Sequence, residues 1–325
     1  RPLVFATGDG GGSWKDISGD LPDGVIAWSI QQDHVEAGLL FLGADNGVYV
    51  SVDGGGHWQK LSNGVPTIPF RDLALQRRDN DLVAASFGRG IYVLDDYSPL
   101  RQLAALRRSN AQLAPAETPF ALFDVRDAWW YIPSVPGQAK GLPTRGSTDW
   151  RAANPAHGVS FTVYIGQSFA DASDRRALDE RRLADAGKDI PFPGWDALAE
   201  EGRAQTARYL LEISNEEGNT VRRLEVPNER GVHRMTWDMR GAVPDRITLE
   251  QGGFRSPWSR LPEGPLLAPG RYAAQLQRVD KEGVAVLGEP TSFALRSVDN
   301  LPGDVDYEEA AQFRVQVADA KRRLG

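Results

Sequence analysis

The 325-residue chain contains no cysteine, which excludes disulfides and thiolate chemistry. It has four histidines, and none of them follows another at the spacing typical of a zinc site, so we expect no metal and no cofactor. No apolar run approaches the ~18 residues of a membrane-spanning helix. The net charge of −7, with no long basic cluster, argues against nucleic-acid binding.

Two octapeptides, residues 7–14 and 51–58, share one pattern of a hydroxyl residue, an Asp, a Gly and a Trp at fixed positions. These residues are Thr7, Asp9, Gly11 and Trp14 in the first copy and Ser51, Asp53, Gly55 and Trp58 in the second. Glycine supplies the positive φ of a tight turn, the carboxylate accepts hydrogen bonds from turn amides, and the indole covers apolar area. We therefore expect the two Asp residues to lock hairpins rather than to catalyse or to bind metal.

This pattern is similar to the Asp-box of bacterial neuraminidase-type (BNR) repeats, S/T-x-D-x-G-x-T-W, with His57 in place of the usual Thr or Ser. In the families that it resembles, the box lies at the periphery of a propeller blade, away from the ligand-binding face. The resemblance implies a repeat propeller and a structural role for both octapeptides.

The spacing of the copies supports this interpretation. Thr7 and Ser51 are 44 positions apart. Gly90-Ile91-Tyr92-Val93 lies 43 positions after Gly47-Val48-Tyr49-Val50 and matches it, although the third copy has lost the octapeptide. Four short strands per ~40–45 residues is typical of a propeller blade. Residues 1–98 thus predict about two terminal blades, whereas propellers close with ~4–8. The chain begins inside a strand-like segment, so we expect missing N-terminal blades of the same protein to be its partner.

Residues 99–158 are rich in proline, which favours a long connection over continuous helix or central strand. The segment contains the aromatic cluster Trp129, Trp130 and Tyr131. Two interpretations remain open. The rings pack the connection onto a neighbouring domain, which we favour, or they form a stacking platform for a sugar.

The pattern from residue 159 onwards is again mainly β. Alternating segments separated by turn residues predict an immunoglobulin-like sandwich over residues 159–297, with a charged helical insertion at about 171–204. A linker and a C-terminal helix occupy residues 298–325, because apolar residues recur there at helical spacing.

With these segments in order, the chain resembles the C-terminal part of bacterial sortilin-type or Asp-box propeller proteins of the "glycosyl hydrolase-like" group, with an appended immunoglobulin-like or fibronectin-like domain. Residues 86–96 look like the last-blade motif of that group. The resemblance implies a secreted or cell-envelope protein and fixes no activity.

Two functions remain open. In the first, the chain is a non-catalytic binding and scaffold portion with a peptide or glycan ligand, no nucleic acid and no membrane insertion. In the second, it is the C-terminal portion of a glycoside hydrolase, xyloglucanase-like or sialidase-like, whose acids lie mostly in missing blades. The candidate catalytic acids are Asp45, Asp72, Asp95 and Asp96, and the arginines available for a substrate carboxylate are Arg71 and Arg89.

Overall fold

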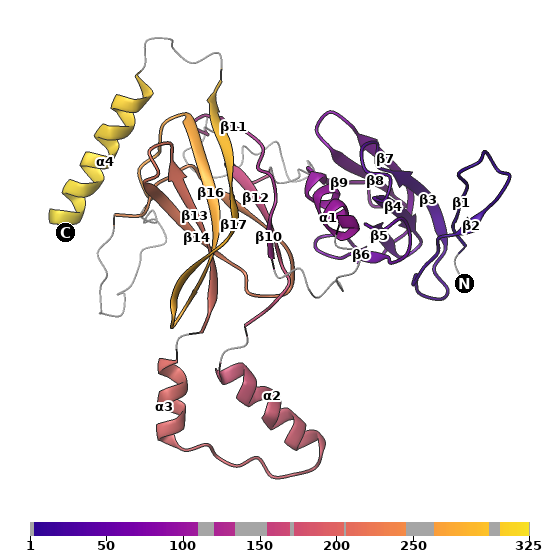
Figure 1. The fold of residues 1–325 in the computed structure, drawn as a ribbon, viewed down its shortest axis with the longest axis horizontal. Helices are drawn as coiled ribbons and strands as arrows, with labels where there is room; N and C mark the ends of the chain where they lie inside the picture. The colour runs from indigo at the N-terminus through magenta and orange to yellow at the C-terminus, as the bar shows by residue number, and fades with distance from the viewer. Residues whose placement is uncertain are drawn as a thin grey trace. The chain divides into compact units, whose positions relative to one another are not determined.

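The computed structural model describes residues 3–109, 120–133, 155–169, 172–204, 206–244, 263–298 and 306–324. They form a mainly β protein that divides into two compact units, Arg1–Thr118 (unit 1) and Pro119–Gly325 (unit 2), whose elements are labelled in Figure 1. This confirms the mainly β fold class, with a partial propeller followed by a sandwich.

Unit 1 contains one complete four-stranded antiparallel blade, flanked by parts of two others. The complete blade consists of β3 (Ala27–Gln32), β4 (Leu40–Ala44), β5 (Gly47–Ser51) and β6 (Gln59–Leu61). The hairpin of β1 (Phe5–Ala6) and β2 (Lys15–Asp16) precedes it, and the sheet of β7 (Phe70–Gln76), β8 (Asp81–Ser86) and β9 (Ile91–Leu94) follows it. Each octapeptide joins two paired strands, β1 to β2 and β5 to β6.

The complete blade is packed on both faces, and every residue of β4 and β5 is buried. Leu40, Leu42 and Tyr49 form one cluster with Val4, which precedes β1, and with apolar residues of the loop after β2. Phe41, Val48 and Val50, which alternate with them, pack in a second cluster against β7 and β8. Side chains of successive strand residues point to opposite faces, so two-sided burial explains why these strands read as continuous apolar runs.

The third repeat ends differently, with helix α1 (Ser98–Ser109) after β9 in place of a fourth strand. The sequence there lacks the glycines of the octapeptide, and Pro99 stands in the first turn, where its fixed φ favours a helix start.

Unit 2 is a sandwich with a three-stranded sheet, β10-β12-β15, and a five-stranded sheet, β11-β17-β16-β13-β14. The strands are β10 (Phe120–Leu122), β11 (Ala128–Trp130), β12 (Val159–Ile165), β13 (Arg208–Asn215), β14 (Thr220–Val226), β15 (Gly231–Trp237), β16 (Gly270–Asp280) and β17 (Gly283–Ser297). Trp237, Phe161 and Leu211 lie fully buried in one core cluster. β10 and β11 come from the segment expected to be a connection, and each pairs with a sandwich strand.

Three helices accompany this sandwich. α2 (Ala172–Asp185) and α3 (Trp195–Arg203) form a helical arm beside the sheets, and neither helix has a buried residue. The C-terminal helix is α4 (Tyr307–Leu324), whose Tyr307 ring meets the Trp130 ring edge-on. Among the described helices, none is both long enough and apolar enough to cross a bilayer.

Candidate functional site

The octapeptide 51–58 is closed by hydrogen bonds from its own side chains. The Ser51 hydroxyl donates to Asp53 Oδ1 at 2.9 Å, and the Gly55 amide donates to Ser51 Oγ at 2.8 Å. The His57 amide donates to Asp53 Oδ1 at 2.9 Å, and His57 Nδ1 lies 2.6 Å from Asp53 Oδ2. Partial burial acts to raise the pKa of Asp53, but hydrogen bonds from His57 and Ser51 outweigh burial and lower it.

The octapeptide 7–14 makes the same set of contacts. Asp9 accepts hydrogen bonds from the hydroxyl of Thr7 at 2.9 Å and from the amide and hydroxyl of Ser13 at 2.9 and 2.7 Å. The bonds from Ser13 hold the pKa of the Asp9 carboxyl well below its usual range. His57 therefore takes the place of Ser13 in the second copy, with its ring nitrogen where the first copy has a hydroxyl.

The two tryptophans differ. Trp58 is 7% exposed, its indole N–H donates to the Ile17 carbonyl at 3.0 Å, and its amide donates to Asp20 Oδ1 at 2.7 Å. Trp14 is 63% exposed. The loop after β2 thus covers Trp58, and no described residue covers Trp14 in the same way.

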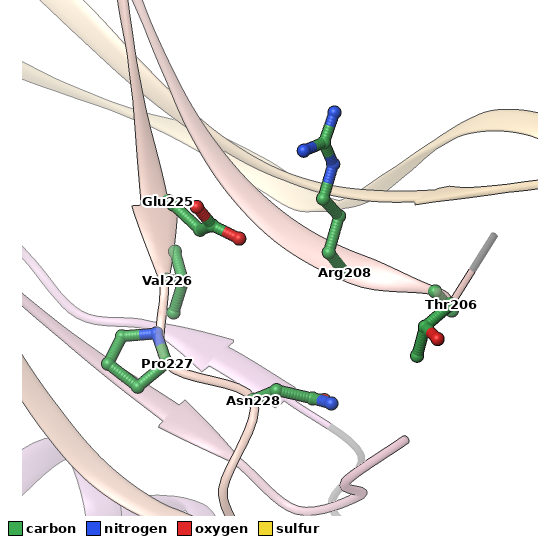
Figure 2. A pocket seen from close by; sticks show the side chains of 7 residues that line it. Thr206, Arg208, Glu225, Val226, Pro227 and Asn228 are labelled. Carbon is green, nitrogen blue, oxygen red and sulfur yellow. The ribbon is translucent and has the colours of Figure 1, made fainter. Parts of the chain in front are cut away.

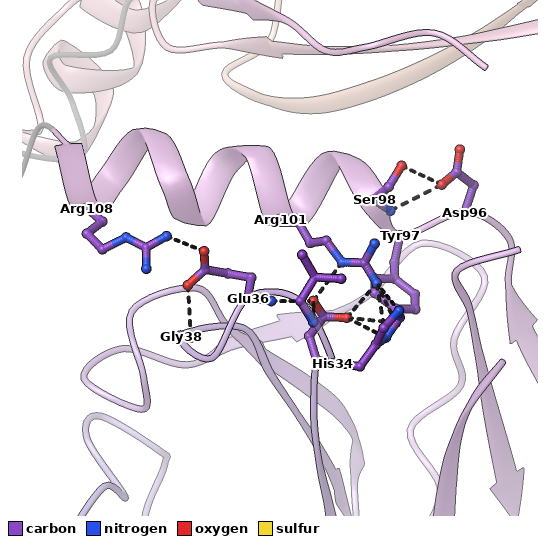
Figure 3. Close-up of polar contacts among 10 residues, drawn as sticks. His34, Glu36, Gly38, Asp96, Tyr97, Ser98, Arg101 and Arg108 are labelled. Atoms are coloured by element: carbon purple, nitrogen blue, oxygen red, sulfur yellow. Dashed lines mark hydrogen bonds and ion pairs between the residues drawn. The ribbon is translucent and has the colours of Figure 1, made fainter. Parts of the chain in front are cut away.

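A second polar network attaches α1 to the loop 33–39 between β3 and β4 (Figure 3). The buried Asp33 carboxylate accepts hydrogen bonds from Arg101 Nε at 2.6 Å, from Arg101 Nη2 at 2.7 Å and from the Tyr97 hydroxyl at 2.9 Å. The amides of Val35 and Glu36 donate to it as well, and Arg108 forms an ion pair with Glu36.

This network has the charge pattern of a structural lock. Burial acts to raise the pKa of Asp33, but the donors of Arg101, Glu36 and Tyr97 outweigh burial and hold it well below its usual range. Burial and the Asp33 carboxylate raise the pKa of Tyr97 to about 12. Neither group is poised to exchange a proton near neutral pH.

The candidate acids also make local hydrogen bonds. Asp45 accepts from the Ile26 amide at 3.0 Å, Asp72 accepts from the Leu73 amide at 2.9 Å, and Asp96 accepts from the Ser98 amide and hydroxyl at 3.2 and 2.6 Å. Asp72 pairs with Ala85 near the end of β8, whereas the Asp96 amide donates to Asp81 at its start. The four-residue step from Asp81 to Ala85 along β8 spans about 13 Å. The backbones of Asp72 and Asp96 are therefore further apart than the ~5–9.5 Å that separates two glycosidase carboxylates.

The aromatic cluster of β11 does not present three rings on one face. Trp130 is 3% exposed and its indole N–H donates to the Leu267 carbonyl at 2.7 Å. Trp129 is 59% exposed, and Tyr131 is exposed beside His157, with ring centroids 4.3 Å apart. Strand alternation explains the difference, since neighbouring residues point to opposite faces.

Unit 2 also has a surface hollow of about 430 Å³ lined by residues that flank β13 and β14, shown in Figure 2. Asn228, at its rim, exchanges two hydrogen bonds with the backbone of Phe169. Glu225 and Arg208 are the charged residues of this lining. In the part of the chain that the structure describes, no three His, Asp or Glu side chains gather as metal ligands.

The most distinctive exposed cluster lies in unit 1, where β3 contacts β7. The Arg71 guanidinium carbon is 3.6 Å from the centroid of the Trp28 ring and 5.4 Å from the centroid of the Phe87 ring. Trp28 is 43% and Phe87 68% exposed. We call these three residues the stacked arginine cluster.

The turn that carries Phe87 is held in place. The Phe87 amide donates to the Pro69 carbonyl at 2.8 Å, and the Ser86 amide and hydroxyl donate to the Gly90 carbonyl at 3.0 and 2.7 Å. Gly88 and Gly90 have φ of +85° and +81°, which glycine adopts without strain. Sequence reasoning had named Arg71 and Arg89 but missed Trp28, although alternation along β3 places Trp28 on its exposed side.

No family model matches the chain, and no curated protein matches it significantly. Solved structures that it resembles include two of the extracellular domain of BT4673, described as a putative one-component or hybrid two-component system of B. thetaiotaomicron. Their identities are 11% and 12%, and their TM-scores 0.21 and 0.19. Another is PorZ, a surface component of the type-IX secretion system of Porphyromonas gingivalis, at 12% identity and a TM-score of 0.18. The matches cover 83–88% of this chain and 27–30% of the others, and likeness this low defines neither family nor function.

Proposed function

We propose that the chain is a non-catalytic binding and scaffold portion of a larger secreted or cell-envelope propeller protein, with a glycan or peptide ligand. The observation that carries the proposal is the stacked arginine cluster, an exposed pair of aromatic rings around a cation. Such a surface offers stacking and hydrogen bonding to a ligand. The acids beside it, Asp45 and Asp72, are hydrogen-bonded to backbone amides in turn or strand-end positions.

The scaffold part of the proposal rests on the two tryptophans. Trp58 is covered by the loop after β2, and Trp14 occupies the same position of the preceding repeat with its ring exposed. A further blade on the N-terminal side, carrying its own equivalent of Ile17 and Asp20, would cover Trp14 in the same way. We therefore propose such blades of the same protein as the partner of unit 1.

The experiment is a glycan and peptide array probed with this chain, followed by incubation of each bound ligand with the protein and chromatography of the products. We expect binding of at least one ligand class and no shortened products. Chain-dependent hydrolysis would reject the non-catalytic role, and the absence of any bound ligand would reject the binding role.

A further inference from the structure

We propose that the stacked arginine cluster is a recognition site for the carboxylate of an acidic sugar, with Arg71 as the carboxylate-binding residue. This inference rests on the binding role proposed above and adds to it a site and a class of ligand.

The first step concerns the unused donors of Arg71. Within the described residues, its guanidinium forms no hydrogen bond and no ion pair, and its sequence neighbour Asp72 does not pair with it. The side chain is exposed, yet the Trp28 ring at 3.6 Å and the Phe87 ring at 5.4 Å limit its freedom. An arginine already ordered by aromatic rings loses less entropy when it binds a ligand.

The second step is the geometry of those donors. A guanidinium is planar, and its N–H groups point outward from its edge, so stacking on a ring leaves them available to an acceptor beside the ring. Two parallel N–H donors match the two oxygens of a carboxylate, which makes the bidentate pair stronger and more directional than a single hydrogen bond.

The third step concerns the rings. Trp28 and Phe87 expose apolar surface next to the cation, and an apolar C–H face of a sugar ring can pack on such a surface while the sugar carboxylate reaches Arg71. A nucleic acid fits this site poorly, because its phosphate backbone requires several cations and the cluster supplies one guanidinium. A sugar ring with a single carboxylate requires only one cation at the site.

The test uses the full chain and isothermal titration with tri-galacturonate, its methyl ester, and a tripeptide with a free C-terminus. We expect the acid to bind and the uncharged ester to bind at least about tenfold more weakly, the loss typical of a charge-assisted pair. Arg71→Ala and Arg71→Lys should each weaken the binding of tri-galacturonate by a similar factor, because lysine keeps the charge but lacks the planar guanidinium with its two parallel donors. Trp28→Ala should weaken the binding of both tri-galacturonate and its methyl ester.

Arg77→Ala is the matched control, because Arg77 is an exposed arginine just beyond the opposite end of β7. The affinity of this variant for tri-galacturonate should stay within about twofold of wild type. Melting temperatures of all variants verify folding. If tri-galacturonate binds Arg71→Ala as tightly as wild type, Arg71 is not the carboxylate-binding residue and only the general binding role stands. If only the tripeptide or neutral glycans bind, the acidic-sugar assignment is wrong. If the chain binds nothing on the arrays either, both proposals fail.

Discussion

Trp14 and Trp58 occupy one position of a repeated octapeptide and differ in one respect, the cover over the indole. Trp58 is buried and donates two hydrogen bonds to residues 17 and 20, whereas Trp14 is largely exposed. Gly55 in the same octapeptide approaches Ile17 so closely that a Cβ on it would lie 2.6 Å from the Ile17 carbonyl oxygen. At Gly11 of the first copy, the nearest such neighbour is a Trp14 ring atom at 3.8 Å.

We predict that Trp58→Ala lowers the free energy of unfolding by about 3–5 kcal/mol, since it removes a large buried side chain and leaves a cavity. Trp14→Ala is the matched control and should cost less than about 1 kcal/mol, as expected for an exposed position. Urea denaturation of both variants provides the measurement. Equal losses of unfolding free energy in the two variants would contradict the conclusion that Trp58 is covered and Trp14 is not.

At the residue scale, the sequence was sufficient for features that depend on local geometry. The side-chain hydrogen bonds of Asp9 and Asp53 are of this kind, because they join residues at most four positions apart. The burial of Trp58 and exposure of Trp14 could not be distinguished, because the covering loop lies about 40 residues away in the chain. The same holds for the stack of Trp28 on Arg71, which joins two blades.

At the scale of elements, α1 shows how a polar lock attaches a helix to a blade. Asp33 lies in the loop after β3, and its partners Tyr97 and Arg101 lie at the start of the helix. The sequence predicts a long connection from residue 99, and the loss of the octapeptide glycines is the signal that the repeat ends there. The 12-residue helix α1 was not predicted from the sequence, because its polar contacts to the loop 33–39 are not visible in a local pattern.

We predict that Asp33→Asn destabilises unit 1 by about 3–5 kcal/mol at pH 7, because Arg101 is left without its buried counter-charge. The pKa of Asp33 is lower in the folded than in the unfolded chain, so the stability it contributes is present above the unfolded pKa of about 3.9 and is lost as pH falls towards the folded value. The difference in melting temperature between wild type and variant should therefore be constant from pH 7 to about pH 5 and shrink below pH 4.

The exposed Asp23→Asn is the control for this pH series, and its melting temperature should follow the wild type throughout. A difference for Asp33→Asn that grows as the solution becomes more acidic would contradict the lock, since it would require an Asp33 carboxyl that is protonated more easily in the folded protein.

At the scale of the whole molecule, the two units differ in how completely their sheets are covered. In unit 2 both sheets contribute to one closed core. In unit 1 the complete blade is buried on both faces, but the sheet of β7, β8 and β9 exposes Ile91 and Val93, which pair across the strands with Ala85 and Val83. Patterns in the sequence predicted the strands correctly, yet an apolar run in a strand looks the same whether its second face is covered or open.

We predict that the open face of this sheet causes the chain to self-associate, because contiguous exposed apolar surface on a blade favours a partner. Sedimentation velocity over a range of concentrations should show a rising weight-average mass, and the double variant Ile91→Lys and Val93→Lys should reduce it. Val284→Lys with Val286→Lys is the matched control, because these two valines are also exposed but lie on β17 of unit 2. A chain that stays monomeric at every concentration would contradict the prediction that the open face of this sheet packs against a partner. Association that the β17 variant abolishes instead would place the contact on the sandwich.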